Sequence, residues 1–216
     1  MSIGIIFDLD GVIGSTDENH FLAWKRMADE EGIPFDRCVN EFLRGVSRMD
    51  SLDIILKNTD KIFTIEQKKE MAERKNRYYR ESLMTITPND ILPGVNDVLH
   101  ELKSRNIAIA IGSSSKNTPL ILERIGMSDM FDAVADGNLI KNSKPDPEVF
   151  LLAAKYLNIP PGHCVVIEDA VAGVEAAINA EMKVVAVGSA SEDPRAHYRI
   201  TDLAHADIEE IISLGR

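Results

Sequence analysis

Short apolar runs alternate with longer amphipathic stretches along the chain, and the two patterns predict different elements. Runs rich in Ile, Val and Ala predict buried strands at residues 3–7, 107–111, 164–167 and 183–187, and a weaker one at 133–135. Helical periodicity fills the intervals, with helices predicted at 95–106, after Thr118-Pro119, after Pro147, soon after residue 169 and at 206–214. Continuous apolar strands that alternate with helices predict a parallel, doubly wound α/β sheet of the Rossmann-like type.

Residues 15–87 differ from the rest because only helical patterns occur there. Residues 15–18 (Ser-Thr-Asp-Glu) read as a capping box that opens a helix, and this helix is expected to stop near Gly32. Further helical patterns run from the mid-thirties to residue 57 and from 66 to 82. We therefore expect a helical cap, residues 15–87, inserted into an α/β core of residues 1–14 and 88–216.

Composition narrows the classes of function. The chain has 216 residues and a net charge of −11, which argues against binding to nucleic acid or to anionic lipid. No apolar run approaches the ~20 residues of a membrane span, and no secretion signal is evident. Two distant cysteines, Cys38 and Cys164, suit a reduced cytoplasm better than a disulfide framework. We expect a cytoplasmic monomer that acts on a small molecule.

The first strand leads directly into two carboxylates, Asp8 and Asp10, followed by Gly11. Side chains two apart in a strand point the same way, so both carboxylates are expected beyond the carboxyl end of the strand, where parallel sheets bind ligands. Like charges this close repel unless a cation joins them, and Mg²⁺ prefers such oxygen ligands. An acidic turn after a strand would have the same sequence, so this pair alone is ambiguous.

Polar residues also follow two other strands. Ser113 follows the run at 107–111, Glu168-Asp169 follow the run at 164–167, and Lys144 precedes the helix opened by Pro147. A carboxylate can attack phosphorus, a second can carry a proton, and a hydroxyl with a lysine can neutralise phosphoryl oxygens. Each part has a simpler reading: a solvated serine loop, a surface lysine, or a helix N-cap at Glu168-Asp169.

Taken in order, these four parts resemble the four motifs of the haloacid dehalogenase-like hydrolase superfamily, over essentially the whole chain. Within it, the cap segments resemble the beta-phosphoglucomutase family. The resemblance rests on Asp8-Leu9-Asp10-Gly11-Val12, Ser113-Ser114-Ser115-Lys116-Asn117, Lys144-Pro145-Asp146-Pro147, Glu168-Asp169, Asn19-His20, Gly45-Val46-Ser47-Arg48 and Glu73-Arg74-Lys75-Asn76. That family commonly has an aspartate where this chain has Ser15.

The resemblance implies a role for each matched residue. Asp8 is implied as the nucleophile and Asp10 as the general acid and base. Mg²⁺ is implied to bind Asp8, the backbone carbonyl of Asp10 and Asp169, with Glu168 alongside. Phosphate and sugar contacts are implied for Thr16, His20, Arg48, Lys75, Ser113, Ser114, Ser115, Lys116, Asn117 and Lys144.

The function so implied is a phosphosugar mutase, an isomerase that interconverts β-D-glucose 1-phosphate and glucose 6-phosphate. It implies an aspartyl-phosphate enzyme, a β-glucose 1,6-bisphosphate intermediate and glucose 1,6-bisphosphate as priming activator. A Mg²⁺-dependent sugar-phosphate phosphatase could use the same core. A non-enzymatic phospho-acceptor switch also places carboxylates, a hydroxyl and a lysine at a sheet edge, but it needs no cap of about 70 residues.

Overall fold

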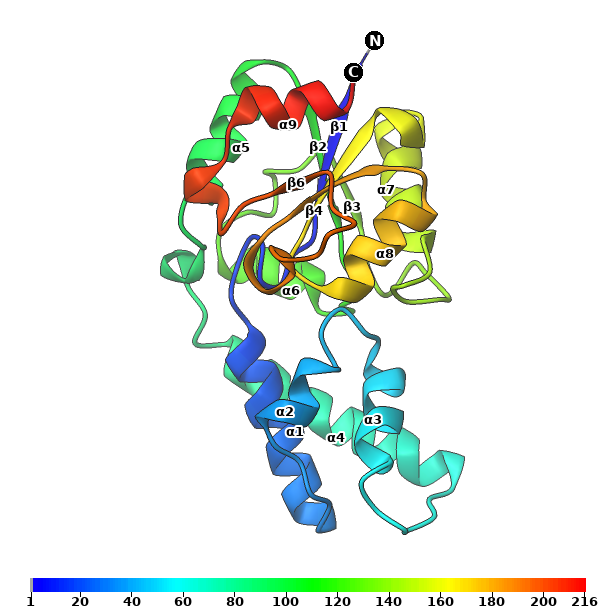
Figure 1. Cartoon of the computed structure of the whole chain (residues 1–216). Coiled ribbons are helices and arrows are strands. Elements are labelled where there is room, and N and C mark those ends of the chain that lie inside the picture. The colour runs from blue at the N-terminus through cyan, green and yellow to red at the C-terminus, as the bar shows by residue number, and fades with distance from the viewer. Residues whose placement is uncertain (1) are drawn as a thin grey trace.

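A parallel sheet of six strands forms the centre of the larger part of the molecule (Figure 1). The computed structural model describes residues 2–216. The strands lie in the order β3-β2-β1-β4-β5-β6. Their bounds are β1 Gly4–Phe7, β2 Ala108–Gly112, β3 Ala133–Ala135, β4 Cys164–Glu168, β5 Lys183–Ala186 and β6 Tyr198–Arg199. The predicted α/β fold is confirmed.

Strand register decides which side chains meet at the carboxyl edge. In the central strand, Phe7 lies opposite Ile111 of β2 and Ile167 of β4. Asp8 follows β1, Ser113 follows β2, and Glu168 is the last residue of β4. The register therefore places these three residues side by side at one edge of the sheet. This is the edge where parallel α/β sheets bind ligands.

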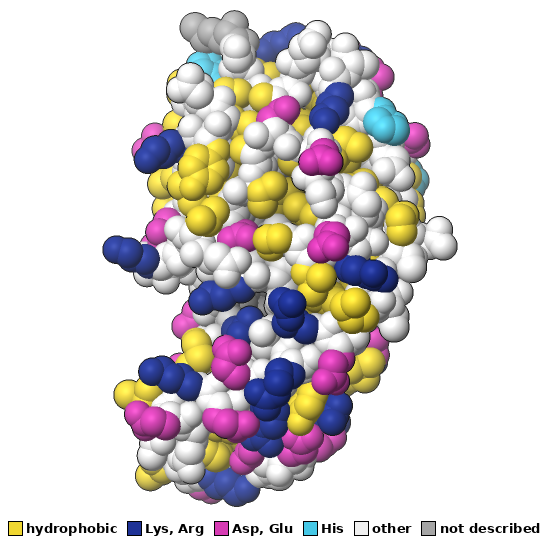
Figure 2. All heavy atoms as spheres, turned by 180° about the vertical axis from the view of Figure 1, so that it is seen from behind, with side chains coloured by type: hydrophobic (Ala, Val, Ile, Leu, Met, Phe, Trp, Pro, Cys, Tyr) yellow, Lys and Arg dark blue, Asp and Glu magenta, His cyan; other side chains and the backbone are white. Residues whose placement is uncertain are grey.

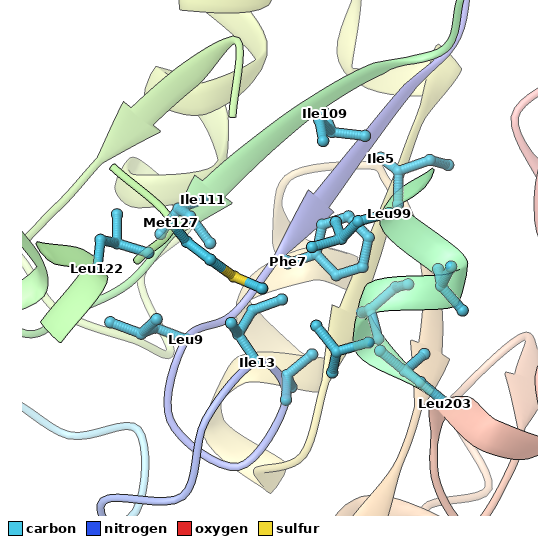
Figure 3. Packing of buried hydrophobic residues seen from close by; sticks show 14 of the residues in the cluster. Ile5, Phe7, Leu9, Ile13, Leu99, Ile109, Ile111, Leu122, Met127 and Leu203 are labelled. Atoms are coloured by element: carbon cyan, nitrogen blue, oxygen red, sulfur yellow. The ribbon is translucent and has the colours of Figure 1, made fainter. Parts of the chain in front are cut away.

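Helices cover both faces of the sheet. The apolar cluster on one face includes residues from α5 Val95–Ser104, α6 Thr118–Arg124 and α9 Ile208–Leu214, and the cluster on the other includes residues from α7 Glu148–Leu157 and α8 Val171–Asn179. Successive side chains of β1 point to opposite faces of the sheet: Ile5 and Phe7 belong to the first cluster and Ile6 to the second. Figure 3 shows Phe7 and Leu99 packed together in the first cluster. Ile5, Ile6 and Phe7 are all fully buried, as expected of a central parallel strand.

A second, all-helical body follows β1 and hangs below the carboxyl edge of the sheet in Figure 1. It consists of α1 Asp17–Glu31, α2 Arg37–Glu41, α3 Arg48–Leu56 and α4 Ile65–Leu83. Trp24, Met27, Leu52 and Ile55 form a core of its own. This arrangement confirms the predicted helical cap, while the boundaries at residues 14–15 and 87–88 stay a prediction. None of the helices described over residues 2–216 is long and apolar enough to cross a membrane.

Four details differ from the sequence prediction. Thr16 precedes α1, but its hydroxyl makes no cap hydrogen bond, so the predicted capping box is wrong. The helical pattern ending at residue 57 is broken between α2 and α3, where Gly45 takes a positive φ of 72°. The edge strand β6 was not predicted, because it is two residues long and has no apolar run. The N-cap of α8 is Ala170, which excludes the simple cap reading of Glu168-Asp169.

Candidate active site

A cleft of about 570 Å³ lies between the carboxyl edge of the sheet and the helical cap. The back view in Figure 2 shows the surface drawn in at this level, with Lys and Arg side chains gathered around it. Predicted site residues from both parts of the molecule line the cleft: Asp8, Asp10, His20, Arg48, Lys75, Ser113, Ser114, Ser115, Lys116, Asn117 and Asp169. The other three are not among its lining residues; they are the buried side chains Thr16, Lys144 and Glu168.

A buried lysine joins two carboxylates beneath the floor of the cleft. The Nζ atom of Lys144 lies 2.5 Å from Oδ1 of Asp8 and 2.6 Å from Oε1 of Glu168. Burial alone would lower the pKa of Lys144, but the attraction of Asp8 and Glu168 outweighs it, and the net shift is upward. The surface-lysine reading is therefore wrong: Lys144 is a fixed cation behind Asp8.

Asp8, Glu168 and Asp169 can each bring one carboxylate oxygen to within 4.8 Å of the other two. Burial comes first in raising the pKa of both Glu168 and Asp169, and the charge of Asp8 adds to it. The three carboxyl groups therefore resist being ionised together, and Lys144 only partly relieves their mutual repulsion. Buried carboxylate oxygens in this arrangement are the donors that Mg²⁺ prefers, so the residues fit the predicted ion. The Asp10 side chain is not part of the cluster, in keeping with a contact through its backbone carbonyl.

Two glycines leave room for these carboxylates. A Cβ atom on Gly11 would lie 2.1 Å from Oδ2 of Asp169, and Gly11 also has a φ of +82°. A Cβ atom on Gly173 would lie 1.8 Å from Oε1 of Glu168. Side-chain atoms do not approach this closely, so both positions require glycine for the cluster to form.

Asp10 is turned toward the cap, not toward the carboxylate cluster. The Thr16 hydroxyl donates a short hydrogen bond to Oδ1 of Asp10, and the Tyr79 hydroxyl donates to Thr16 over 2.9 Å. Burial raises the pKa of Asp10 to about 7, the Thr16 bond opposes this shift, and the charge of Asp8 adds to it. Thr16 thus orients the carboxylate that the resemblance identifies as acid and base, which explains why it does not cap α1.

The loop after β2 presents hydroxyl, amide and cationic groups to the cleft. The Ser113 hydroxyl accepts a hydrogen bond from the backbone N–H of Ser115 at 3.2 Å. Within residues 2–216 the buried Ser114 hydroxyl has no hydrogen-bond partner. Lys116 is exposed at the rim, whereas Asn117 is buried. A buried hydroxyl without a partner in a cleft is a group that an oxygen-rich ligand could satisfy.

The cap contributes cations to the opposite wall. Arg48 forms an ion pair with Glu73 at 3.1 Å, and burial lowers the pKa of its guanidinium. The Lys75 ammonium lies 2.8 Å from Nδ1 of His20 and is 2% exposed, unlike the more exposed lysines and arginines around it on α4. Burial, followed by repulsion from Arg48, holds the pKa of Lys75 well below its usual range. The cap therefore holds positive charge that is poorly compensated.

Sequence reasoning missed three residues of the site. Arg44, from the loop before α3, pairs with Asp169 at 3.1 Å and with Asp17 at 2.8 Å. Arg44 lies four residues before Arg48 and directly before the segment Gly45-Val46-Ser47-Arg48 that carries the resemblance, which is the signal that could have found it. Tyr79 lies four residues after Lys75, on the same face of α4, and Asn76 lines the cleft. Helical spacing from Lys75 could have found Tyr79. Asn76 ends the segment Glu73-Arg74-Lys75-Asn76 that carries the resemblance, although the resemblance implied no role for it.

Comparison with known proteins supports the sequence resemblance. The family model described as haloacid dehalogenase-like hydrolase matches residues 4–181. The beta-phosphoglucomutase of Bacillus subtilis is 47% identical over 186 residues, covering 85% of this chain and 82% of that protein. The phosphorylated carbohydrates phosphatase of Thermotoga maritima is 32% identical over 97% of this chain and 96% of that protein.

A solved structure agrees with the fold. The crystal structure of beta-phosphoglucomutase from Clostridium difficile superposes with a TM-score of 0.94 at 44% identity. The match covers 100% of this chain and 97% of that one, so sheet and cap are both included.

Proposed function

The chain belongs to the haloacid dehalogenase-like hydrolase family and is an enzyme of the beta-phosphoglucomutase type, and from this premise we propose its reaction. The proposed reaction interconverts β-D-glucose 1-phosphate and glucose 6-phosphate. It passes through an aspartyl phosphate on Asp8 and through β-glucose 1,6-bisphosphate. Each turnover transfers a phosphoryl group twice, so the sugar must bind in two orientations.

One observation carries this proposal: a single cleft offers phosphate-binding groups in two places. Asp8 with Lys144 and Ser113 forms one set on the core side. Arg48 on the cap, with Lys116 and Asn117 opposite, forms another. A bisphosphate needs both sets at once, whereas hydrolysis of a monophosphate needs only the first.

In the proposed first transfer, an Asp8 oxygen attacks the phosphorus of the bisphosphate, and the bond from phosphorus to the sugar oxygen breaks. Asp10 gives its proton to the departing sugar oxygen. In the other transfer, the 6-hydroxyl of an incoming β-glucose 1-phosphate attacks the phosphorus of the aspartyl phosphate, Asp10 takes the proton of that hydroxyl, and the bond from phosphorus to the Asp8 oxygen breaks. The bisphosphate so formed then turns to present its 1-phosphate to Asp8, and the transfer described first releases glucose 6-phosphate. Asp10 must both release and bind a proton near neutrality, and its raised pKa is consistent with this.

Groups that are already in place can stabilise the negative charge that develops on the phosphoryl oxygens during these steps. Lys144 is held against Asp8 and Glu168, so it requires no rearrangement to face the transferring oxygens. Asp8, the backbone carbonyl of Asp10 and Asp169 would hold Mg²⁺, with Glu168 alongside. The ion would screen the negative charge of the nucleophile and the phosphoryl group.

Closure of the cap would limit hydrolysis of the aspartyl phosphate by excluding water. Several polar contacts already cross the cleft, including the Ser143 hydroxyl to Oδ2 of Asp50 at 3.0 Å. Arg44 adds a second bridge through Asp169. These contacts support a cap that can seal the site around a sugar phosphate.

The test is phosphorus NMR of the enzyme with Mg²⁺, β-glucose 1-phosphate and a trace of glucose 1,6-bisphosphate. Glucose 6-phosphate without inorganic phosphate is the expected product. Inorganic phosphate as the main product would replace the mutase with the sugar-phosphate phosphatase, the second candidate, which similarity to the Thermotoga maritima phosphatase keeps open. An Asp10→Asn variant that folds but no longer turns over would exclude the phospho-acceptor switch.

We further propose that the enzyme works as a cytoplasmic monomer. Sedimentation at micromolar concentration should give a single species close to the chain mass of 23.9 kDa.

A further inference from the structure

Asn117 occupies the N-cap position of α6 but does not cap it. Asparagine is among the best N-cap residues because its side-chain oxygen accepts a hydrogen bond from the first helical turn. Here the backbone N–H of Asn117 donates to the Ser115 hydroxyl at 3.2 Å, while the side chain turns away toward the cap. A residue that gives up its usual local bond, while 5% exposed in a cleft, indicates a competing demand on its amide.

The competing partners both come from α4. Nδ2 of Asn117 donates to Oδ1 of Asn76 at 3.0 Å, and Oδ1 of Asn117 accepts from the Arg80 guanidinium at 3.2 Å. Asn76 and Arg80 are four residues apart, so they share one face of the helix. Together they fix both ends of the amide, and its orientation cannot flip without losing both bonds.

That orientation has a chemical consequence. Because the amide oxygen already accepts from Arg80 and one N–H already donates to Asn76, the amide has one free N–H donor for a ligand in the cleft. This N–H suits a group with acceptor oxygens, such as a phosphate. Arg80 also adds positive charge near Arg48, whose pKa it helps to lower. Arg80 itself is exposed and is not among the residues that line the cleft.

We propose that Arg80 is a positioning residue, which acts through Asn117 to fix the phosphate-binding loop against the cap for the non-reacting phosphate of a bisphosphate. This inference rests on the proposed mutase. It assigns Arg80 a role in affinity for phosphate and none in the transfer steps at Asp8.

The test measures steady-state kinetics with β-glucose 1,6-bisphosphate and, separately, the Kd of inorganic phosphate by calorimetry. Arg80→Ala should raise both the KM and the phosphate Kd about tenfold and leave kcat within about twofold. Arg80→Gln keeps a donor without the charge and should recover most of this loss. Arg77→Ala removes an exposed arginine of the same helix, paired only loosely with Glu70 at 3.9 Å, and should change neither value.

A double-mutant cycle separates positioning from general charge. In an Asn117→Ala background, Arg80→Ala should have less than a twofold further effect, because the bond it supplies is already gone. An undiminished effect there, or a failure of Arg80→Gln to recover binding, would show that Arg80 acts only through its charge and overturn the proposal. If the enzyme shows no mutase turnover, the proposed function fails, while the phosphate affinities of the same variants still decide the role of Arg80.

Discussion

The Lys75 ammonium lies 2.8 Å from Nδ1 of His20 and packs against the rings of Trp24 and Tyr79, at 4.8 and 4.6 Å from their centroids. No carboxylate forms a close ion pair with it among the residues described, and Asp10 only offsets part of the cost. A cation in such a place is destabilising until an anion arrives. Burial of Lys75 thus lowers the stability of the free enzyme, and it leaves a positive charge in the cleft for an anionic ligand.

Replacing this lysine should make the protein more stable and its stability less dependent on pH. The folded state holds the Lys75 proton more weakly than the unfolded chain, where the pKa returns toward 10.5, so the unfolded state binds more protons between the two values. Wild-type stability therefore contains a contribution that rises with pH across this window. Lys75→Met should have a free energy of unfolding higher by about 1 kcal/mol or more at pH 7.

Urea unfolding at pH 7, 8.5 and 9.5 measures this difference. The advantage of Lys75→Met should shrink as the pH rises, whereas Lys69→Met, on the exposed part of the same helix, should give a constant small difference. Parallel stability curves for Lys75→Met and wild type would contradict the burial of an uncompensated cation.

Asp169→Asn should separate metal binding from folding. Three buried carboxylates repel one another, so removing one charge relieves the fold even though Arg44 loses a partner. In EDTA the variant should be at least as stable as the wild type. In excess Mg²⁺ the wild type should gain about 2.7 kcal/mol at a hundredfold excess over Kd. Asp169→Asn should gain almost nothing and lose turnover. Thermal unfolding with and without Mg²⁺ measures both, and an equal gain in the variant would remove Asp169 from the metal site.

The core of the site could be predicted because its residues follow strands. Asp8, Ser113 and Glu168 each come directly after an apolar run, and parallel register then brings them together whatever the loops between them do. The same reasoning finds the helical cap, because a stretch without any strand pattern cannot join the sheet.

The remaining contacts of the site could not be predicted, because they depend on which of several possible partners a side chain bonds. Hydrophobic periodicity carries no information about that. Thr16 and Asn117 both stand at helix starts where capping is the local preference, and both turn to partners distant in the sequence. Arg44 reaches Asp169 across 125 positions of sequence. Such pairings are set by how the cap rests on the core, and that arrangement is a property of the whole fold.

Gly173→Ala should damage the site from within α8. The added Cβ would lie 1.8 Å from Oε1 of Glu168, so either the helix or the Lys144–Glu168 pair must shift. We expect the free energy of unfolding to fall by about 2 kcal/mol or more, with a loss of turnover. Gly162→Ala is the matched control, because nothing lies within 4 Å of its Cβ position, and it should be close to neutral. Chemical denaturation compares the two, and equal stabilities would refute the tight packing inferred at Glu168.

Arg48→Ala tests whether the cap side of the cleft binds the non-reacting phosphate. The Arg48 side chain is partly buried, but its ion-pair partner Glu73 is largely exposed to solvent. An ion pair of this kind contributes little to stability, so the loss of Arg48 should cost little. Losing one charge-assisted phosphate contact should raise KM for the bisphosphate at least tenfold. Because β-glucose 1-phosphate would then bind the phosphorylated enzyme more weakly, a larger share of the aspartyl phosphate should pass to water before the sugar can take it. Phosphorus NMR should show more inorganic phosphate per glucose 6-phosphate than in the wild type.

Arg37→Ala, which removes an exposed cap arginine paired with Glu18, is the control and should keep the wild-type ratio. An unchanged product ratio and KM in Arg48→Ala would place the second phosphate elsewhere and leave the phosphatase as the better description of this cleft.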